Sequence, residues 1–274
     1  MVGRMKSLAL DVSEHVATVR LLGPGKGNAL GPDFWRECPG LFEELDANED
    51  VRAIVLHGEG EHFSYGLDLK AMIADLGPHM SPNGLAKERT KLLDLVARLQ
   101  RSADSIAQCR KPTIAAIAGY CIGGGVDLVS ACDIRLASQD AKLSVRETRV
   151  AMVADLGSLQ RLPRIVGKGL ARELAFTGDD VGAERALRIG LVNEVFADRA
   201  ALLDGARALA LRIAKNPPLV VQGVKQVMDY CEDKSVKDGE RFVAVWNSAF
   251  LASGDLSEAL SAFAERREPR FRGE

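Results

Sequence analysis

The stretch of the chain best suited to chemistry combines adjacent glycines with a carboxylate. Residues 116–129 read AIAGYCIGGGVDLV, so an apolar, strand-like run enters Gly123, Gly124 and Gly125 and leaves as a helical pattern that carries Asp127. Glycine lets the backbone approach a ligand closely, and free N–H groups at a helix N-terminus attract anions. Because Asp127 has apolar neighbours, its carboxylate is expected to point into the same low-dielectric cleft. The stretch predicts an oxyanion donor beside an acid, although a tight structural turn with Asp127 stabilised by the helix dipole explains it equally well.

A second glycine-containing turn follows the predicted strand at residues 53–57. Residues 64–67 read SYGL, and the backbone N–H of Leu67 is expected to point into a cleft, where two such turns could stabilise one oxygen. The preceding residues 58–63 read GEGEHF and lack the third glycine of a dinucleotide-binding fingerprint, so a Rossmann cofactor site is not favoured. His62 has no partner at the spacing of a metal site or a catalytic triad, and we interpret it as a loop residue.

Two further acids complete the candidate set. Glu147 stands between two arginines, where a solvated surface charge is a natural interpretation. Asp155 follows four apolar residues and has the position of a cap for a helix over residues 156–162. For each acid taken alone, the structural interpretation is favoured: a surface charge for Glu147 and a helix cap for Asp155. Taken together with Asp127, they predict a cluster of three carboxylates near the glycine turns.

The composition of the 274-residue chain is that of a globular protein, with 47% hydrophobic and 27% charged residues. A formal net charge of −2 offers no basic field for nucleic acid, whereas a phosphate-bearing small molecule remains compatible. The five cysteines are odd in number and form no C-x-x-C pair, which argues against a disulfide framework or a structural zinc site and favours a cytoplasmic protein. The most apolar region is interrupted by glycines and Asp127 before it reaches membrane-spanning length, so no membrane insertion is expected.

Hydrophobic periodicity predicts alternating strands and helices before the C-terminal part of the chain. A β-hairpin is expected within residues 8–22, before the first helix. The predicted helices cover residues 32–48, 85–109, 126–132, 170–176 and 183–189, and the predicted strands cover residues 53–57, 113–118 and 134–137. This succession of strand, turn and helix indicates a layered α/β architecture that carries both glycine turns after strands.

The remainder of the chain shows only helical patterns. Four helices are predicted over residues 198–216, 219–232, 236–252 and 256–267. A helical tail of this kind commonly covers a neighbour or a subunit interface, so an oligomer is expected. The chain is therefore divided into a core of residues 1–197 and a helical oligomerisation region of residues 198–274.

With these residues assembled, the chain resembles the crotonase (enoyl-CoA hydratase/isomerase) superfamily over essentially its whole length. The matching segments are NAL at 28–30, FSYGLDL at 63–69, KP at 111–112, GYCIGGGVDL at 119–128, CDIR at 132–135, QRL at 160–162 and FAERR at 263–267. The resemblance implies an α/β fold with a crotonase-like ββα superhelix core and a helical C-terminal trimerisation region. It also implies an acyl-CoA substrate bound by the core, and self-association as a homotrimer or a dimer of trimers.

By position, the resemblance implies that the backbone N–H groups of Leu67 and Gly124 form an oxyanion hole for the thioester carbonyl. It also implies a set of substrate-binding residues, two of which are basic groups near the CoA phosphates. This set contains Ser64, Tyr65, Gly66 and Asp68 in the second turn, and the basic residues Lys26 and Arg266. Coenzyme A belongs to the substrate, so neither a further cofactor nor a metal ion is expected.

Three acids distinguish this chain within the superfamily. Hydratases usually carry glutamate where Asp127 stands and a glycine-rich segment where Asp155 stands. The combination of Asp127, Glu147 and Asp155 looks instead like the 3,5-2,4-dienoyl-CoA isomerases, which use three acidic residues at these positions. Tyr65 and Leu67 replace small residues that are common in hydratases, which leaves the preferred acyl chain length open.

The resemblance therefore implies an isomerase that converts 3,5-dienoyl-CoA to 2,4-dienoyl-CoA. Glu147 is expected to remove the proton at carbon 2 and Asp155 to protonate carbon 6, while Asp127 tunes Glu147. Like charges in one cleft raise at least one pKa, so one acid can be protonated while another is ionised. The alternatives are a 2-enoyl-CoA hydratase of fatty-acid oxidation, a non-catalytic acyl-CoA-binding protein of the same fold, and, less favoured, a nucleotide-dependent oxidoreductase.

Overall fold

A six-stranded sheet forms the centre of the computed structural model, which describes residues 5–79 and 85–274. Its strands, in spatial order, are β1 (Leu8–Ser13), β2 (Val16–Leu21), β3 (Ala53–Gly58), β4 (Thr113–Ile117), β6 (Ile134–Ser138) and β9 (Glu194–Phe196). The first two strands form the predicted antiparallel hairpin, and every other neighbouring pair is parallel. Glu14 and His15 close the hairpin with φ values of 51° and 64°, a backbone that matches the twist of the strands.

A second, smaller sheet lies beside the glycine turn. It contains β5 (Tyr120–Ile122), β7 (Lys142–Ser144) and β8 (Val181–Gly182), with β5 and β7 parallel. Periodicity did not predict these strands or β9, because two or three residues are too few to show an alternation. The small sheet nevertheless positions chemistry: β5 leads directly into Gly123, and β7 leads towards Glu147.

Helices connect the strands and cover the sheet. Those of the core are α1 (Pro32–Ala47), α2 (Leu69–Leu76), α3 (Ala86–Gln108), α4 (Gly124–Ala131), α5 (Ser158–Ile165), α6 (Lys168–Thr177) and α7 (Ala183–Arg188). The helices predicted over residues 32–48 and 85–109 are confirmed to within one residue at each end. Helix α4 begins two residues before the predicted start, because two of the glycines form its first turn. Helix α2 was missed, since Met72 is its only fully buried residue.

The segment around Asp155 differs from its structural interpretation. Helix α5 begins at Ser158, with Gly157 at its N-cap, and continues through Pro163. Asp155 therefore lies before the cap and does not stabilise the start of this helix. The expectation of a capping role for Asp155, with a helix over residues 156–162, is wrong, and its carboxylate is left available for another role.

Apolar side chains cover both faces of the sheet, which explains why β3 is buried at every position. Ile54 and Leu56 belong to the larger core, which also contains α1 and α3 side chains. Val55 faces the opposite side, where α8 (Arg199–Ala214) packs. This helix buries a stripe at intervals of four residues, made by Leu202, Ala206, Ala210 and Ala214. By packing, α8 belongs with the sheet, so the helices that leave the core begin one helix later than the boundary predicted after residue 197.

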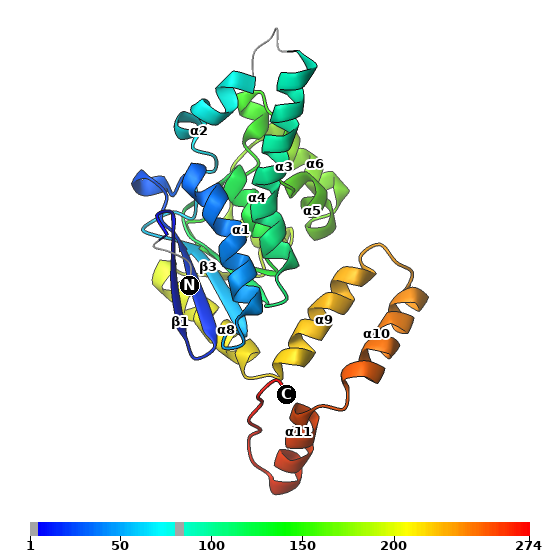
Figure 1. The fold of residues 1–274 in the computed structure, drawn as a ribbon. Helices are drawn as coiled ribbons and strands as arrows, with labels where there is room; N and C mark the ends of the chain where they lie inside the picture. The colour runs from blue at the N-terminus through cyan, green and yellow to red at the C-terminus, as the bar shows by residue number, and fades with distance from the viewer. Residues whose placement is uncertain (1–4, 80–84) are drawn as a thin grey trace.

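Three helices project from the core at the C-terminal end, α9 (Pro218–Cys231), α10 (Val236–Phe250) and α11 (Gly254–Glu265) (Figure 1). Lys225 anchors α9 through a 2.9 Å bond from Nζ to Asp133 Oδ2. Several large apolar side chains on these helices remain exposed, namely Val224 (53%), Met228 (67%), Val245 (69%), Leu260 (64%) and Phe263 (86%). The four predicted tail helices are confirmed. Within residues 5–79 and 85–274, no helix is long and apolar enough to cross a membrane.

Candidate active site

Two glycine turns bring a pair of backbone N–H groups together. The Gly66 carbonyl accepts a hydrogen bond from Leu30 N at 2.8 Å, and because the peptide is trans, the Leu67 N–H on the same peptide plane points the opposite way. Neither this amide nor that of Gly124 donates to an acceptor within the part of the chain that the structure describes. A Cβ placed on Gly124 would lie 3.7 Å from Leu67 N. The two donors predicted to stabilise an oxyanion therefore lie in adjacent turns and are both free.

Gly123 joins the donor at Gly124 to an acid. It adopts φ 52° and ψ −116°, a conformation that disfavours residues with a side chain. A Cβ at this position would also lie 3.0 Å from Glu147 Oε1. Its N–H donates to Ser144 O at 2.9 Å, which ties the turn to strand β7. Glycine is therefore needed at this position both for the backbone and to admit the carboxylate of Glu147.

Glu147 carries a partly buried carboxylate at the start of a short 3-10 turn, Glu147–Val150. Its Oε2 is buried without a hydrogen-bond partner among the residues described. Burial raises the pKa of Glu147 to about 7, and the charges of Asp127 and Asp155 add to the shift. The flanking arginines do not neutralise it, because Arg146 pairs with Asp180 and Arg149 with Asp179. The interpretation of Glu147 as a solvated surface charge is therefore wrong, and its carboxyl group is suited to accept a proton near neutral pH.

Asp127 is buried behind the glycine turn, with only 1% of its surface exposed. Its Oδ1 accepts a hydrogen bond from Ser158 N at 2.7 Å, so this carboxylate caps α5 and links it to α4. Burial raises the pKa of Asp127 to about 6, against the lowering effect of the bonds from Ser158, and the charge of Asp155 raises it further. The position explains how Asp127 affects its neighbours, since it holds two helices together and places charge beside them.

Asp155 follows both of these acids in the chain and is exposed on the surface of the isolated chain. Its main-chain oxygen accepts from Gln100 Nε2 at 2.7 Å, which fixes the segment against α3. Although the residue is exposed, nearby residues of the same chain remove enough water to raise the pKa of its carboxyl group. The structure thus brings Asp127, Glu147 and Asp155 within electrostatic reach of one another, as the sequence predicted.

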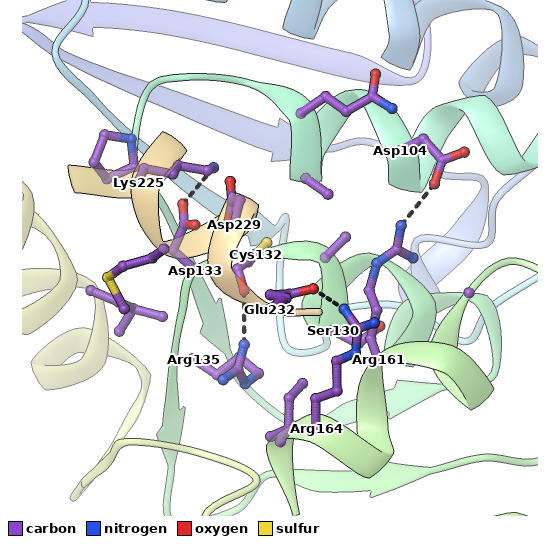
Figure 2. A pocket seen from close by; sticks show the side chains of 18 of the residues that line it. Asp104, Ser130, Cys132, Asp133, Arg135, Arg161, Arg164, Lys225, Asp229 and Glu232 are labelled. Atoms are coloured by element: carbon purple, nitrogen blue, oxygen red, sulfur yellow. Dashed lines mark hydrogen bonds and ion pairs between the residues drawn. The ribbon is translucent and has the colours of Figure 1, made fainter. Parts of the chain in front are cut away.

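A large cavity lies elsewhere, between α9 and helices α3 to α5 (Figure 2). Its volume is about 1340 Å³, and Asp155 reaches its edge, but Leu67, Gly124 and Glu147 do not line it. Its charged side chains are largely paired with one another, as in Arg161–Asp104 at 2.7 Å, Lys225–Asp133 at 2.9 Å and Arg164–Glu232. Since these pairs leave little charge for a ligand, the glycine turns and their acids form the better candidate active site.

Two residues predicted to bind substrate serve the turn itself. Ser64 is fully buried, and its hydroxyl bonds only to the backbone of Asn28 and Gly66. Asp68 caps α2 by accepting from Ala71 N at 2.9 Å. Burial keeps the Ser64 side chain from any ligand, so a contact of this residue with substrate would have to come from its backbone. Asn28, which accepts the Ser64 hydroxyl bond, was predicted only as part of the matching segment at 28–30. The sequence signal for its role is an asparagine in a glycine-rich loop, where left-handed backbone is common.

The other predicted binding residues differ in their placement. Tyr65 is 45% exposed, stacks on His62 with ring centroids 5.1 Å apart, and lies beside Gly66 at the site. Arg266 ends α11 in a left-handed conformation, and in Figure 1 this helix is far from the glycine turn. A single chain therefore does not bring Arg266 to the other site residues. The side chain of Lys26 lies outside the described part of the structure.

An α/β core with two free amides beside three coupled acids defines a class of protein suited to stabilise an oxyanion next to proton-transfer groups. The family model described as enoyl-CoA hydratase/isomerase matches residues 11–274. The chain therefore belongs to the enoyl-CoA hydratase/isomerase family.

Known proteins resemble the chain throughout its length. A protein named Delta(3,5)-Delta(2,4)-dienoyl-CoA isomerase, mitochondrial, from Dictyostelium discoideum is 45% identical over 260 residues, covering 95% of this chain and 88% of that relative. A peroxisomal protein of the same name from Arabidopsis thaliana is 45% identical over 248 residues, covering 90% and 89%. The crystal structure of an enoyl-CoA hydratase from Bacillus anthracis superposes with a TM-score of 0.88 at 30% identity, covering 98% of this chain and all of that one. The predicted crotonase-like core is thus confirmed.

Proposed function

We propose that the protein is an isomerase that converts 3,5-dienoyl-CoA to 2,4-dienoyl-CoA. The observation that carries this proposal is the partly buried Glu147 carboxylate, with a pKa near 7 and an oxygen that has no partner in the described chain, beside two free N–H groups. The names of the 45%-identical relatives support the same reaction. The coenzyme A of the substrate is the only cofactor that the proposal requires, and no step uses a metal ion.

The reaction begins when Glu147 removes a proton from carbon 2 of the bound thioester. Negative charge then moves to the thioester oxygen, where the Leu67 and Gly124 amides donate hydrogen bonds. Loss of one such donor typically raises the barrier by about 3 to 4 kcal/mol. The resulting dienolate extends the charge along the acyl chain to carbon 6.

Asp155 completes the reaction by donating a proton to carbon 6. Its exposure in the isolated chain decreases when an acyl chain covers it, and the lost water raises its pKa further, so that the proton is retained until transfer. Asp127 assists both Glu147 and Asp155. It holds α5, and the segment before it that carries Asp155, against α4, and it adds negative charge near Glu147. Two acids at separate points of the substrate thus supply the two proton transfers that the isomerisation requires.

Purified protein with a 3,5-dienoyl-CoA tests this proposal directly. We expect rapid growth of the ultraviolet absorbance of the thioester-conjugated diene and slow hydration of a 2-enoyl-CoA in a parallel assay. Fast hydration without diene conjugation would instead identify a hydratase. That second candidate is favoured by the structural likeness to an enoyl-CoA hydratase. It is opposed by the Asp127 carboxylate, which is buried and already bonded to Ser158 N and so is poorly placed to activate water.

The pH dependence of kcat/KM should report the ionisation of Glu147. This carboxyl group must be ionised to accept a proton, and its pKa is raised from 4.5 to about 7. Activity towards 3,5-dienoyl-CoA is therefore expected to rise tenfold per pH unit below pH 7, and to fall again at higher pH where Asp155 loses the proton that it must donate. An ascending limb centred near pH 4.5, the ordinary value for a glutamate, would contradict the raised pKa of Glu147 on which this assignment rests.

Self-association as a homotrimer or a dimer of trimers is part of the proposal. The exposed apolar side chains of α9, α10 and α11 support it, since a single chain leaves them in water. Light scattering should give three or six times the mass of the chain, whereas a monomeric mass would remove this assignment. A role for Arg266 at the CoA phosphates then depends on a neighbouring copy, because its own chain places it away from the turn. A cytoplasmic location stays a prediction.

A further inference from the structure

The turn that carries Leu67 has an unusual distribution of hydrogen bonds. Backbone N–H groups on both sides of Leu67 are satisfied at distances up to 3.0 Å. Their acceptors are Ala118 O for Phe63, Tyr120 O for Ser64, Gly27 O for Tyr65, Ser64 Oγ for Gly66, Leu30 O for Asp68 and Leu67 O for Leu69. Of these consecutive amides, only that of Leu67 lacks an acceptor in the described chain. The turn is thus built to offer a single donor to a ligand.

The Ser64 hydroxyl is the one side-chain acceptor among these hydrogen bonds. It accepts from Gly66 N at 3.0 Å and donates to Asn28 O at 2.8 Å. Gly66 adopts φ 81°, and a glycine in this region has many alternative conformations unless its polar groups are held. Ser64 Oγ holds its N–H, while Leu30 N holds its carbonyl at 2.8 Å. Both peptide planes that meet at Gly66 are therefore fixed.

Asn28, whose carbonyl accepts the bond from the Ser64 hydroxyl, is itself held by several hydrogen bonds. It is 2% exposed, adopts a left-handed φ of 46°, and donates from Nδ2 to both Glu59 O and His62 O at 2.8 Å. The loop at residues 27–30 is therefore attached to the end of strand β3 as well as to the turn. The acceptor of the Ser64 hydroxyl is itself rigid, so the hydroxyl can transmit that rigidity to Gly66.

We infer that Ser64 is a positioning residue for the oxyanion hole, whose hydroxyl sets the orientation of the Gly66–Leu67 peptide and aims the Leu67 N–H at the thioester oxygen. The inference rests on the proposed function, because it assigns Leu67 as an oxyanion donor. Ser64 acts through the backbone and does not touch substrate, since its side chain is fully buried.

Removal of the hydroxyl leaves the Gly66 N–H without its acceptor. An unsatisfied buried donor is costly, and rotation of the flexible glycine towards another acceptor relieves that cost while turning the next peptide. The Leu67 amide then no longer points at the oxygen. In Ser64→Ala we expect kcat to fall on the order of tenfold to hundredfold with a change in KM of about twofold at most, because the lost stabilisation belongs to the transition state.

Polarisation of a bound thioester measures this positioning without relying on turnover. The probe is octanoyl-CoA labelled with ¹³C at the thioester carbonyl, observed by infrared difference spectroscopy on the full-length protein. Wild type should lower the carbonyl stretching frequency relative to free octanoyl-CoA, and Ser64→Ala should lose at least about half of that shift. Ser64→Cys, which retains a weak donor and acceptor, should give an intermediate shift and serves as a second variant if Ser64→Ala folds poorly.

Ser138→Ala is the matched control. Ser138 is also fully buried, but its hydroxyl donates to Asp140 Oδ1 at 2.5 Å, with Ile117 O at 3.4 Å, and it ends β6 rather than lying in either glycine turn. It should keep the wild-type carbonyl shift and kcat whatever its thermal stability. A full wild-type shift in Ser64→Ala, or an equal loss in Ser138→Ala, would overturn the inference. A wild-type shift that Ser64→Ala diminishes, in a protein that does not isomerise dienoyl-CoA, would support the inference while refuting the proposed function.

Discussion

Glu147→Gln is expected to lower kcat for 3,5-dienoyl-CoA isomerisation on the order of 10³-fold, because an amide cannot accept the carbon 2 proton. The substitution keeps the shape of a side chain that lies against Gly123, so acyl-CoA affinity should change little. The measurement combines steady-state rates with exchange of the carbon 2 proton for solvent deuterium in a saturated acyl-CoA. Both should disappear together, since both depend on the same proton removal.

A matched control for this variant is Glu173→Gln. Glu173 is exposed on α6, where it pairs with Arg185 at 2.6 Å, and it is outside the proposed site. It should retain wild-type activity and wild-type exchange. Exchange at carbon 2 that continued at the wild-type rate in Glu147→Gln would assign the base to another residue.

The same substitution should stabilise the folded chain at alkaline pH. The pKa of Glu147 is raised on folding, so its favourable contribution is complete below pH 4.5 and is lost as pH rises through about 7. Above that range the wild type carries a poorly solvated charge that glutamine lacks. Denaturant unfolding gives the difference in the free energy of unfolding between the variant and the wild type at pH 4 and at pH 8. After allowance for partial exposure, we expect this difference to shift in favour of the variant by on the order of 1–2 kcal/mol from pH 4 to pH 8.

Asp155→Asn is expected to separate the two halves of the reaction. Isomerisation should fall on the order of 10²-fold or more, because no acid reaches carbon 6, while exchange of the carbon 2 proton through Glu147 should continue. Deuterium incorporation from solvent, followed by mass spectrometry of the recovered thioester, distinguishes the two steps. This split is specific to a second proton-transfer group and would not follow from a general loss of structure.

Asp204→Asn provides the comparison for this variant. Asp204 is an exposed aspartate on α8, away from the acids, and its replacement should leave both exchange and isomerisation at wild-type rates. If Asp155→Asn isomerised 3,5-dienoyl-CoA as fast as the wild type, Asp155 would have no part in the chemistry. If exchange were lost together with isomerisation, Asp155 would act earlier than carbon 6 protonation.

The elements that the sequence predicted well are those whose pattern is local and long. The helix at 32–48 and the strand at 53–57 were found because their burial is continuous or periodic over many residues. The strands β5, β7 and β8 were missed because each has only two or three residues. Their pairing depends on partners distant in the chain, so no local pattern identifies them.

The sequence predicted which residues form the candidate site better than it predicted what each of them does. The residue patterns proposed the three acids and the two turns, and the family resemblance gave them roles, but spacing alone could not place them in space. The bond from Ser158 N to Asp127 joins residues far apart in the chain, and the burial of Ser64 results from packing against a separate loop. The capping interpretation of Asp155 was wrong because Gly157, at φ 114°, ends the preceding segment and starts the helix after it.

The bond that joins Asp127 to α5 also couples Asp127 to the segment that carries Asp155. Glutamate is longer by one methylene, so a glutamate at this position is expected to keep the 2.7 Å bond to Ser158 N only if α5 shifts. Because Asp155 lies only three residues before Ser158, such a shift is expected to move the acid at 155 as well. Substitutions at 127 and 155 are therefore expected to have non-additive effects on activity.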